Sequence, residues 1–300
     1  MSEFLAKEGL NCRWFDVREL VRTDNTWREG KVDWKITEKQ ISEKVSAFLD
    51  QSEGSPAIAL TQGFMGATPG GDTTTLGREG SDYTAAIFAY ALQADEMVIW
   101  KDVPGLLNAD PKYFSRTEKL ASISYREAIE LSYYGATIIH PKTIKPLQNK
   151  DIPLRIKSFV KPGDEGSIIQ NDTAADSLIP SFIFKVDQVL ISIIPRDFSF
   201  IDEQSLSEIL AVFASNAIHI SLMQNSAISF SVCVDNNQRK LSRLFEELGK
   251  DYKVRYNTGL ELITIRHYDQ ATIDRVMEDG KTVLLEMRSR LTAQFVARPH

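Results

Sequence analysis

The sequence predicts an α/β domain with a mainly parallel sheet in its first half and smaller α+β units in its second half. Short apolar strands alternate with loops and helices up to about residue 170, which is typical of parallel sheets covered by helices. Beyond a polar stretch, strands of alternating apolar and polar residues take over. The length of 300 residues suits two or three domains. We expect a first domain at 1–171, a linker at 172–180 and a second region at 181–300.

Composition and charge are ordinary for a globular protein. Apolar residues make up 43% of the chain, charged residues 25%, and the net charge is −6. This charge, without any basic block, argues against a nucleic-acid partner. No apolar run approaches the roughly 20 residues of a membrane span, and the N-terminus lacks a signal-peptide core, so we expect no membrane partner. Cys12 and Cys233 lie far apart without metal-type spacing, which favours reduced thiols and a cytoplasmic location.

The first half alternates strands with helices. Apolar spacing predicts a helix over 36–49, and another follows a glycine-rich loop over about 81–94. Ser124 and Glu127 form a capping box, and His140 precedes a proline that opens a further helix. The short apolar runs that predict strands lie at 56–62, 96–100, 153–157 and 167–170. In such sheets, ligands bind beyond the carboxyl ends of the strands.

The second half shows a β-α-β-β-α-β order over 188–256, which is the ferredoxin-like topology. Its strands are expected at 188–194, 218–222, 228–234 and 252–256, and its helices at 206–213 and 241–248. An abbreviated copy follows over 257–300 and is completed by strand 181–187. Its later elements are a strand at 259–266, a helix at 271–278, and strands near 282–288 and 291–297.

The loop and helix start at 73–86, TTTLGREGSDYTAA, form the most informative stretch of the chain. Glycines let the backbone approach a ligand, and a helix N-terminus presents free N–H groups and positive partial charge. Arg78 can hold a carboxylate through two parallel hydrogen bonds. Asp82, in the first turn, could cap the helix or face a cation. The plain alternative is that Ser81 and Asp82 only cap the helix and Arg78 is a surface residue.

This run closely resembles the aspartokinases when its neighbours are included. Those neighbours are TQGFMG at 61–66, IWKDVPGLLNADPK at 99–112 and YGATIIHP at 134–141. The resemblance implies the C-terminal part of a three-layer α/β/α amino-acid-kinase domain, followed by tandem ACT units. It also implies transfer of the γ-phosphoryl group of ATP to L-aspartate, giving ADP and 4-phospho-L-aspartate. That reaction is the first step toward lysine, threonine and methionine.

The resemblance also implies site residues by position. Arg78 would bind the α-carboxylate of aspartate, and Thr75, Ser81 and the backbone around Phe64 would complete that pocket. Asp82 would lie near the transferred group, and Mg²⁺ would come with the ATP phosphates. The residues implied at the ATP site are Lys101, Asp102, Gly105, Lys112 and Thr137. The plain alternative for the ATP-site loop is a solvated connection between a strand and a helix.

The resemblance further implies that a feedback amino acid binds to the ACT units and that these units form a homodimer. The implied effector residues are Ser221, Gln224 and Asn225. Lysine-sensitive relatives often carry acidic residues nearby, where this chain has Ile220-Ser221 and Ser226-Ala227. Without those carboxylates, the ACT pair could serve dimerisation alone.

The chain departs from the family pattern at its start. Aspartokinases begin with a KFGG-type loop whose lysine contacts the phosphates, and this sequence has no such motif. We therefore expect a truncated aspartokinase that is inactive alone. Two alternatives stay open. The first is a non-catalytic regulatory subunit, and the retained loops at 63–112 argue against it. The second is a kinase for another amino acid such as glutamate, and the ACT-like tail argues against that.

Overall fold

The computed structural model describes residues 1–51, 56–136, 139–197, 199–278 and 280–299, and it separates into two compact units. The first unit comprises Met1–Leu107, Lys119–Ser132 and Thr137–Asp176. The second comprises Asn108–Glu118, Tyr133–Ala136 and Ser177–His300. The second unit therefore includes two short segments that the sequence places in the first domain.

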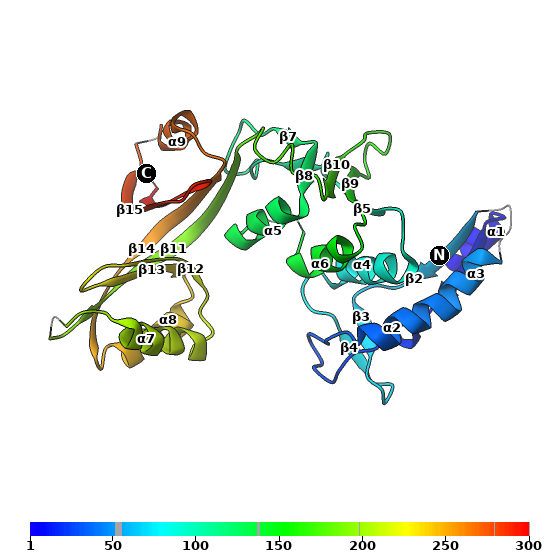
Figure 1. The fold of residues 1–300 in the computed structure, drawn as a ribbon, viewed down its shortest axis with the longest axis horizontal. Helices are drawn as coiled ribbons and strands as arrows, with labels where there is room; N and C mark the ends of the chain where they lie inside the picture. The colour runs from blue at the N-terminus through cyan, green and yellow to red at the C-terminus, as the bar shows by residue number, and fades with distance from the viewer. Residues whose placement is uncertain (52–55, 137–138, 198, 279, 300) are drawn as a thin grey trace. The chain divides into compact units, whose positions relative to one another are not determined.

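The first unit alternates short strands with helices, as the sequence predicts (Figure 1). Its strands are β1 (Asn11–Phe15), β2 (Ala57–Thr61), β3 (Met65–Ala67), β4 (Thr73–Thr75), β5 (Met97–Lys101), β6 (Leu106–Leu107), β7 (Lys119–Leu120), β8 (Ser122–Ser124), β9 (Leu154–Ser158) and β10 (Ser167–Gln170). Its helices are α1 (Ser2–Lys7), the 3-10 turn η1 (Val17–Glu19), α2 (Trp34–Ile41), the π-helical turn η2 (Ser42–Ser46), α3 (Ala47–Asp50), α4 (Gly80–Leu92), α5 (Tyr125–Tyr134) and α6 (Pro141–Asn149). The last residues of α5 belong to the second unit.

Among the described residues, the first unit has three parallel and three antiparallel strand pairings, so the mainly parallel sheet that the sequence predicts is found only in part. Strand β1 pairs with β2 in parallel. A four-stranded sheet has the order β5-β9-β10-β8, in which β5 with β9 and β8 with β10 are parallel and β9 with β10 is antiparallel. Strands β3 and β4 form an antiparallel hairpin. The glycine-rich loop begins where this hairpin ends, just before α4.

Local sequence signals locate the helix starts correctly. The Glu127 amide donates to Ser124 Oγ at 3.0 Å, so the Ser124 half of the predicted capping box is present. The Ser124 amide, which such a box pairs with the Glu127 side chain, donates to Asp176 at 2.7 Å instead. The Lys142 amide donates to Nδ1 of His140 at 3.1 Å, and Pro141 is the first residue of α6. The helix expected over 36–49 is confirmed, but the π-helical turn η2 lies between α2 and α3.

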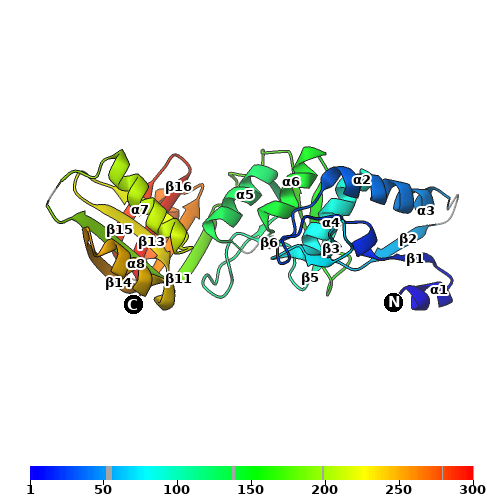
Figure 2. The ribbon, with the colours of Figure 1, turned by 90° about the horizontal axis from the view of Figure 1, so that it is seen from below.

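A buried cluster joins β1 to the helices α2 and α4, which lie on the same side of the strands in Figure 2. The buried members of the cluster are Phe15, Val17, Leu20, Val21, Ile41, Val45, Leu76, Tyr83, Ile87 and Ala91. Leu76 is fully buried and therefore anchors the glycine-rich loop to this core. Burying a leucine side chain of this kind contributes about 1.5–3 kcal/mol.

The second unit is built on a six-stranded sheet with the order β12-β13-β11-β14-β16-β15. Its strands are β11 (Ser181–Pro195), β12 (Ile220–Asn225), β13 (Phe230–Asp235), β14 (Tyr252–Arg266), β15 (Thr282–Arg288) and β16 (Thr292–Arg298). Its helices are α7 (Glu203–Ser215), α8 (Gln238–Leu248) and α9 (Gln270–Met277). The order β12-β13-β11-β14 is that of a ferredoxin-like unit, and β11-β14-β16-β15 repeats it in shortened form.

Each of the two central strands, β11 and β14, serves both ferredoxin-like units. The sequence predicts separate strands at 181–187 and 188–194, and again at 252–256 and 259–266. The structure has one continuous strand of 15 residues in each case. The pairing of the two strands shifts register between Lys185 and Leu190, so an irregularity replaces the expected break.

Each ferredoxin-like unit has its own hydrophobic core. Helices α7 and α8 lie at one end of the sheet and α9 at the other (Figure 1). Helices α7 and α8 cover one cluster, in which Phe213 and Leu244 are buried. Helix α9 covers another, built around Ile263 and Phe295. In the part of the chain that the structure describes, none of the helices is both long and apolar enough to cross a membrane.

Candidate active site

The loop after β2 folds back against the start of α4. Phe64 has a left-handed backbone with φ 74°. Its amide donates to the Thr84 hydroxyl at 2.9 Å, and its carbonyl accepts from the Leu76 amide at 2.9 Å. A Cβ on Gly80 would lie 2.5 Å from the Phe64 ring, so this approach requires glycine. Because both backbone groups of Phe64 are bonded within the chain, its ring, 42% exposed, is what it offers to a ligand.

The N-terminus of α4 is open. Its N-cap residue, Glu79, has φ 53° and provides no side-chain cap. The first helical bond runs from the Tyr83 amide to the Glu79 carbonyl at 3.1 Å, so the amides of 80–82 have no partner among the described residues. Ser81 is exposed, and so is Arg78, whose guanidinium bonds to no described residue. Free amides, a positive helix end and a free guanidinium suit a carboxylate or a phosphate.

Thr75 ends β4 and connects the loop to an earlier part of the chain. Its hydroxyl donates to the Arg28 carbonyl at 3.0 Å, and its carbonyl accepts from the Gly30 amide at 2.8 Å. Because the hydroxyl proton is used, Thr75 has only lone pairs left for a ligand. It can therefore accept a hydrogen bond from a group such as an ammonium. The sequence gives no sign of this contact with 28–30.

Asp82 is half-buried in the first turn of α4. Burial raises the pKa of its carboxyl, Lys101 at the end of β5 lowers it, and Glu79 raises it further. Asp82 and Lys101, which belong to two different parts of the predicted site, therefore interact electrostatically. A half-buried carboxylate with a shifted pKa is a frequent feature of catalytic sites.

Two contacts from the start of α6 reach the glycine-rich loop. The Lys142 ammonium donates to the Leu76 carbonyl at 3.2 Å and lies 5.6 Å from the centre of the Tyr83 ring. The His140 amide donates to the Glu79 carboxylate at 2.8 Å. The sequence alone does not indicate a role for Lys142 or Glu79. These contacts join residues 61 and 66 positions apart, which no local spacing could indicate.

Three of the predicted nucleotide residues, Lys101, Asp102 and Gly105, lie at the end of β5 and in the loop after it. The charge of Lys101 lowers the pKa of Asp82, and Asp102, which follows Lys101, is exposed. Gly105 has φ 142°, and a Cβ there would lie 2.5 Å from Oγ of Ser167. The Ser167 hydroxyl also accepts from the amide that follows Gly105 at 2.8 Å. Close packing against β10 therefore explains this glycine, and its nucleotide role stays a prediction.

The two remaining predicted nucleotide residues, Lys112 and Thr137, stay predictions. Lys112 is exposed and belongs to the second unit, where its amide donates to Asp110 at 2.9 Å. Thr137 lies outside the described residues. Within the described ranges, no group of three or more His, Cys, Asp or Glu side chains is arranged to hold a metal ion.

The predicted effector residues lie on β12, an edge strand of the second unit. The Lys185 ammonium donates to Oγ of Ser221 at 2.9 Å and lies 3.8 Å from the Asp235 carboxylate. Gln224 and Asn225 are exposed. A lysine beside Ser221 favours the carboxylate of an amino acid over its ammonium group. Binding of an effector here stays a prediction.

Gln62, in the TQGF run, has a structural role that the sequence does not reveal. Its side-chain amide donates to the Asp16 carboxylate at 2.8 Å and its oxygen accepts from the Val17 amide at 3.3 Å. Hydrogen bonding from Arg18 lowers the pKa of Asp16 to about 2. Gln62 thereby joins the ends of β1 and β2.

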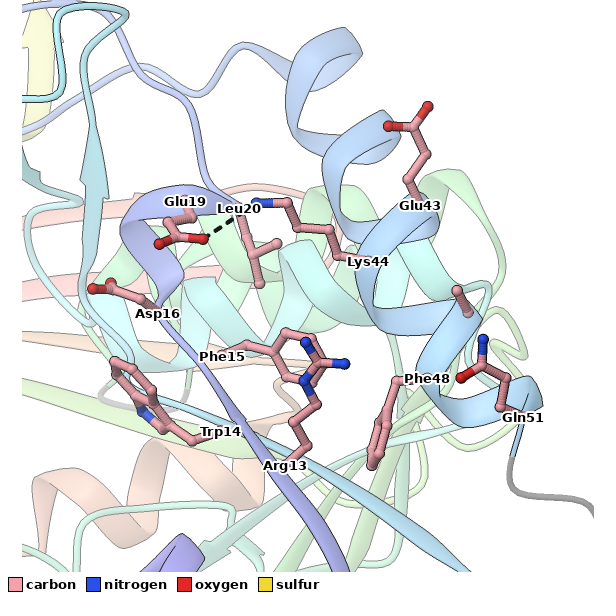
Figure 3. A pocket seen from close by; sticks show the side chains of 11 residues that line it. Arg13, Trp14, Phe15, Asp16, Glu19, Leu20, Glu43, Lys44, Phe48 and Gln51 are labelled. Atoms are coloured by element: carbon pink, nitrogen blue, oxygen red, sulfur yellow. Dashed lines mark hydrogen bonds and ion pairs between the residues drawn. The ribbon is translucent and has the colours of Figure 1, made fainter.

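A separate cavity of about 460 Å³ lies beside β1, η2 and α3 (Figure 3). Its lining residues are Arg13, Trp14, Phe15, Asp16, Glu19, Leu20, Glu43, Lys44, Ala47, Phe48 and Gln51. Several of its charges are already engaged: Lys44 pairs with Glu19 at 3.2 Å, and the Arg13 guanidinium lies 5.0 Å from the centre of the Phe15 ring. None of the predicted site residues lines it. We therefore place the candidate active site at the glycine-rich loop.

Comparison with known proteins connects this fold and loop to a family. The model of the amino acid kinase family matches residues 1–158. Lysine-sensitive aspartokinase 3 of Escherichia coli K12 is 29% identical over 271 residues, which cover 88% of this chain and 59% of that protein. The crystal structure of E. coli aspartokinase III with aspartate and ADP, in the R-state, has a TM-score of 0.78 at 26% identity and covers 99% of this chain and 68% of that chain. The T-state structure of that enzyme with lysine and aspartate has a TM-score of 0.77 at 27% identity, covering 98% and 67%.

The chain belongs to the amino acid kinase family. Within that family, the relative and the solved structures compared above are aspartokinases, and the chain groups with them. The resemblance inferred from the sequence is therefore confirmed. The chain spans 59% of the length of the E. coli relative, so similarity alone does not transfer that enzyme's activity to it.

Proposed function

We propose that this chain carries the aspartate-binding part of an aspartate kinase. Such an enzyme transfers the γ-phosphoryl group of ATP to the side-chain carboxylate of L-aspartate and releases ADP and 4-phospho-L-aspartate. The observation that carries the proposal is the free guanidinium of Arg78 beside the uncapped N-terminus of α4. The E. coli aspartokinase III structure with aspartate and ADP supports it. Phosphoryl transfer depends mainly on positioning and charge neutralisation, which these groups can supply.

The proposed roles follow from the donors and acceptors that remain free. The guanidinium of Arg78 pairs with the α-carboxylate of aspartate. The hydroxyl of Thr75 accepts a hydrogen bond from the α-ammonium group, because its own proton is used internally. The hydroxyl of Ser81 and the free amides of 80–82 stabilise negative charge at the reacting carboxylate. The ring of Phe64 closes one side of the pocket.

On the nucleotide side, Lys101 is the cation that would contact the ATP phosphates. Asp82 and Lys101 interact electrostatically, so their opposite charges partly neutralise each other. Mg²⁺ comes with ATP as part of the substrate, since it prefers phosphate oxygens and water to an all-protein site. Contacts from Asp102, Gly105, Lys112 and Thr137 to the nucleotide belong to the same proposal.

The second unit has the proposed role of binding a feedback amino acid and of forming a homodimer. The tandem ferredoxin-like order of its strands supports this, as does the lysine complex of the E. coli enzyme. The hydroxyl of Ser221, with Lys185 beside it, would receive the effector carboxylate, and Gln224 and Asn225 would contact the rest. A cytoplasmic location is part of the proposal, supported by the free thiols of Cys12 and Cys233.

The reaction is tested by trapping the acyl phosphate. The purified chain is incubated with ATP, Mg²⁺ and L-aspartate in the presence of hydroxylamine, with L-glutamate as the control substrate. Aspartate hydroxamate that requires both ATP and aspartate supports the kinase and contradicts the expectation that this chain is inactive alone. A thermal-shift series with lysine, threonine and methionine is run in parallel. Stabilisation by one of these effectors, without any by aspartate or MgATP, would favour a non-catalytic regulatory subunit instead.

A further inference from the structure

We propose that Lys142 and Glu79 form a two-point clamp on the turn that presents Arg78 and thereby position its guanidinium. This inference rests on the proposed binding of a carboxylate by Arg78. The guanidinium has no partner among the described residues, so its location depends on the backbone that carries it. That backbone is left-handed on both sides of Arg78, with φ 78° at Gly77 and 53° at Glu79. Such a turn needs contacts that hold it in place.

The first contact holds the turn before Arg78. The Lys142 ammonium donates to the Leu76 carbonyl at 3.2 Å, and a charged donor makes this bond stronger than a neutral one. The Tyr83 ring, 5.6 Å away, keeps the ammonium in place through a cation–π contact. The Leu76 amide is bonded to Phe64 at 2.9 Å and its side chain is fully buried. Both backbone groups of Leu76 are therefore fixed.

The second contact holds the turn after Arg78. A left-handed conformation is uncommon for a residue with a Cβ, and Glu79 adopts it at the N-cap of α4. Its carboxylate accepts a hydrogen bond from the His140 amide at 2.8 Å. This bond offsets the strain of the left-handed backbone. A glycine at this position would adopt the same φ without strain but could not make the bond.

Both contacts come from the first turn of one helix, α6, whose own start is capped by His140. Helices α4 and α6 pack against each other within the first unit. The clamp therefore connects the geometry of the Arg78 turn to a rigid element. Lys142 and Glu79 are positioning residues, because their charged groups are bonded to the Leu76 carbonyl and the His140 amide.

The test removes each contact and then restores it. Lys142→Met and Glu79→Ala remove the bonds, whereas Lys142→Arg and Glu79→Gln keep a donor to Leu76 and an acceptor for His140. Lys145→Met, an exposed residue on the same helix, is the matched control. Amide hydrogen exchange is followed in the peptide 76–83, the L-aspartate dissociation constant is measured by calorimetry, and the thermal midpoint of unfolding is recorded.

The clamp predicts faster exchange and roughly fivefold weaker aspartate binding in Lys142→Met and Glu79→Ala. It also predicts recovery of exchange and affinity in Lys142→Arg and Glu79→Gln and no change in Lys145→Met, and the thermal midpoints of these three variants should lie close to that of the unmodified chain. Unchanged exchange in both disrupting variants would overturn the clamp, whatever happens to binding. Failure of the unmodified chain to bind aspartate, while exchange responds as predicted, would instead overturn the proposed function.

Discussion

The Phe64 amide donates a hydrogen bond to the Thr84 hydroxyl at 2.9 Å, which joins the loop after β2 to the first turn of α4. The same hydroxyl donates to the Gly80 carbonyl at 2.8 Å. Thr84 is 3% exposed, so water cannot replace it. One side chain thus fixes both the loop that carries Phe64 and the helix start that carries Ser81.

Thr84→Val keeps the shape of this side chain and removes its hydroxyl. The Phe64 amide then loses its partner in a region with little water, which costs about 1–3 kcal/mol of unfolding free energy. Urea denaturation measures this loss, and aspartate affinity should fall with it. Thr84→Ser, which keeps the hydroxyl, should retain most of the binding. Equal stability of Thr84→Val and the unmodified chain would show that the bond does not form.

Gly80→Ala tests the close approach of α4 to the loop. The added Cβ would lie 2.5 Å from a ring atom of Phe64 and 3.2 Å from its Cα, and the ring can rotate whereas the backbone cannot. We expect a loss of about 1–3 kcal/mol in unfolding free energy, together with weaker aspartate binding. Gly163→Ala is the control, since a Cβ there meets no atom within 4 Å. A similar effect of the two substitutions would contradict the packing described for Gly80.

Asp82→Asn tests the electrostatics of the site through pH. Burial raises the folded-state pKa of Asp82 above its ordinary value of 3.8, so the folded protein holds this proton more tightly than the unfolded chain. The ionised carboxylate of Asp82 therefore destabilises the folded protein at pH values above the folded-state pKa. Below the unfolded-state pKa the carboxyl is protonated in both states and has no such effect. The variant should be more stable than the unmodified chain at neutral pH, and this advantage should shrink as the pH falls toward 3.8.

The pH series for Asp82→Asn has a natural control in Asp202, which caps α7. Its pKa is lowered by hydrogen bonds from the Ser205 amide and hydroxyl, so its charge stabilises the folded state. Asp202→Asn should therefore show the opposite pH trend in urea denaturation. A stability difference for Asp82→Asn that stays constant across the pH range would mean that the carboxyl titrates alike in both states.

The sequence predicts those features that depend on neighbouring residues. The cap at Ser124 and the helix start at Pro141 appear where expected, because such signals act within about three residues. Most predicted helices and strands are found to within a few residues. The π-helical turn at 42–46 is not predicted, because the apolar spacing of 36–49 is compatible with one regular helix.

Contacts between distant residues are what the sequence could not predict. The break expected near Gly259 does not occur, because β14 pairs with β11 on both sides of it, over 252–257 and again over 260–266. The bonds from α6 to Glu79 and Leu76 likewise depend on the packing of two helices. At the candidate site, Arg78 and Ser81 could be proposed from local sequence, whereas Lys142 could not.

The central claim is that Arg78 binds the carboxylate of aspartate, and calorimetric titration of L-aspartate tests it most directly. Arg78→Lys keeps the charge but loses the two parallel hydrogen bonds, so we predict affinity at least about tenfold weaker than that of the unmodified chain. Arg126→Lys, at an exposed position on α5, should bind as the unmodified chain does. Equal aspartate affinity in Arg78→Lys and the unmodified chain, or no binding by the unmodified chain, would contradict the claim.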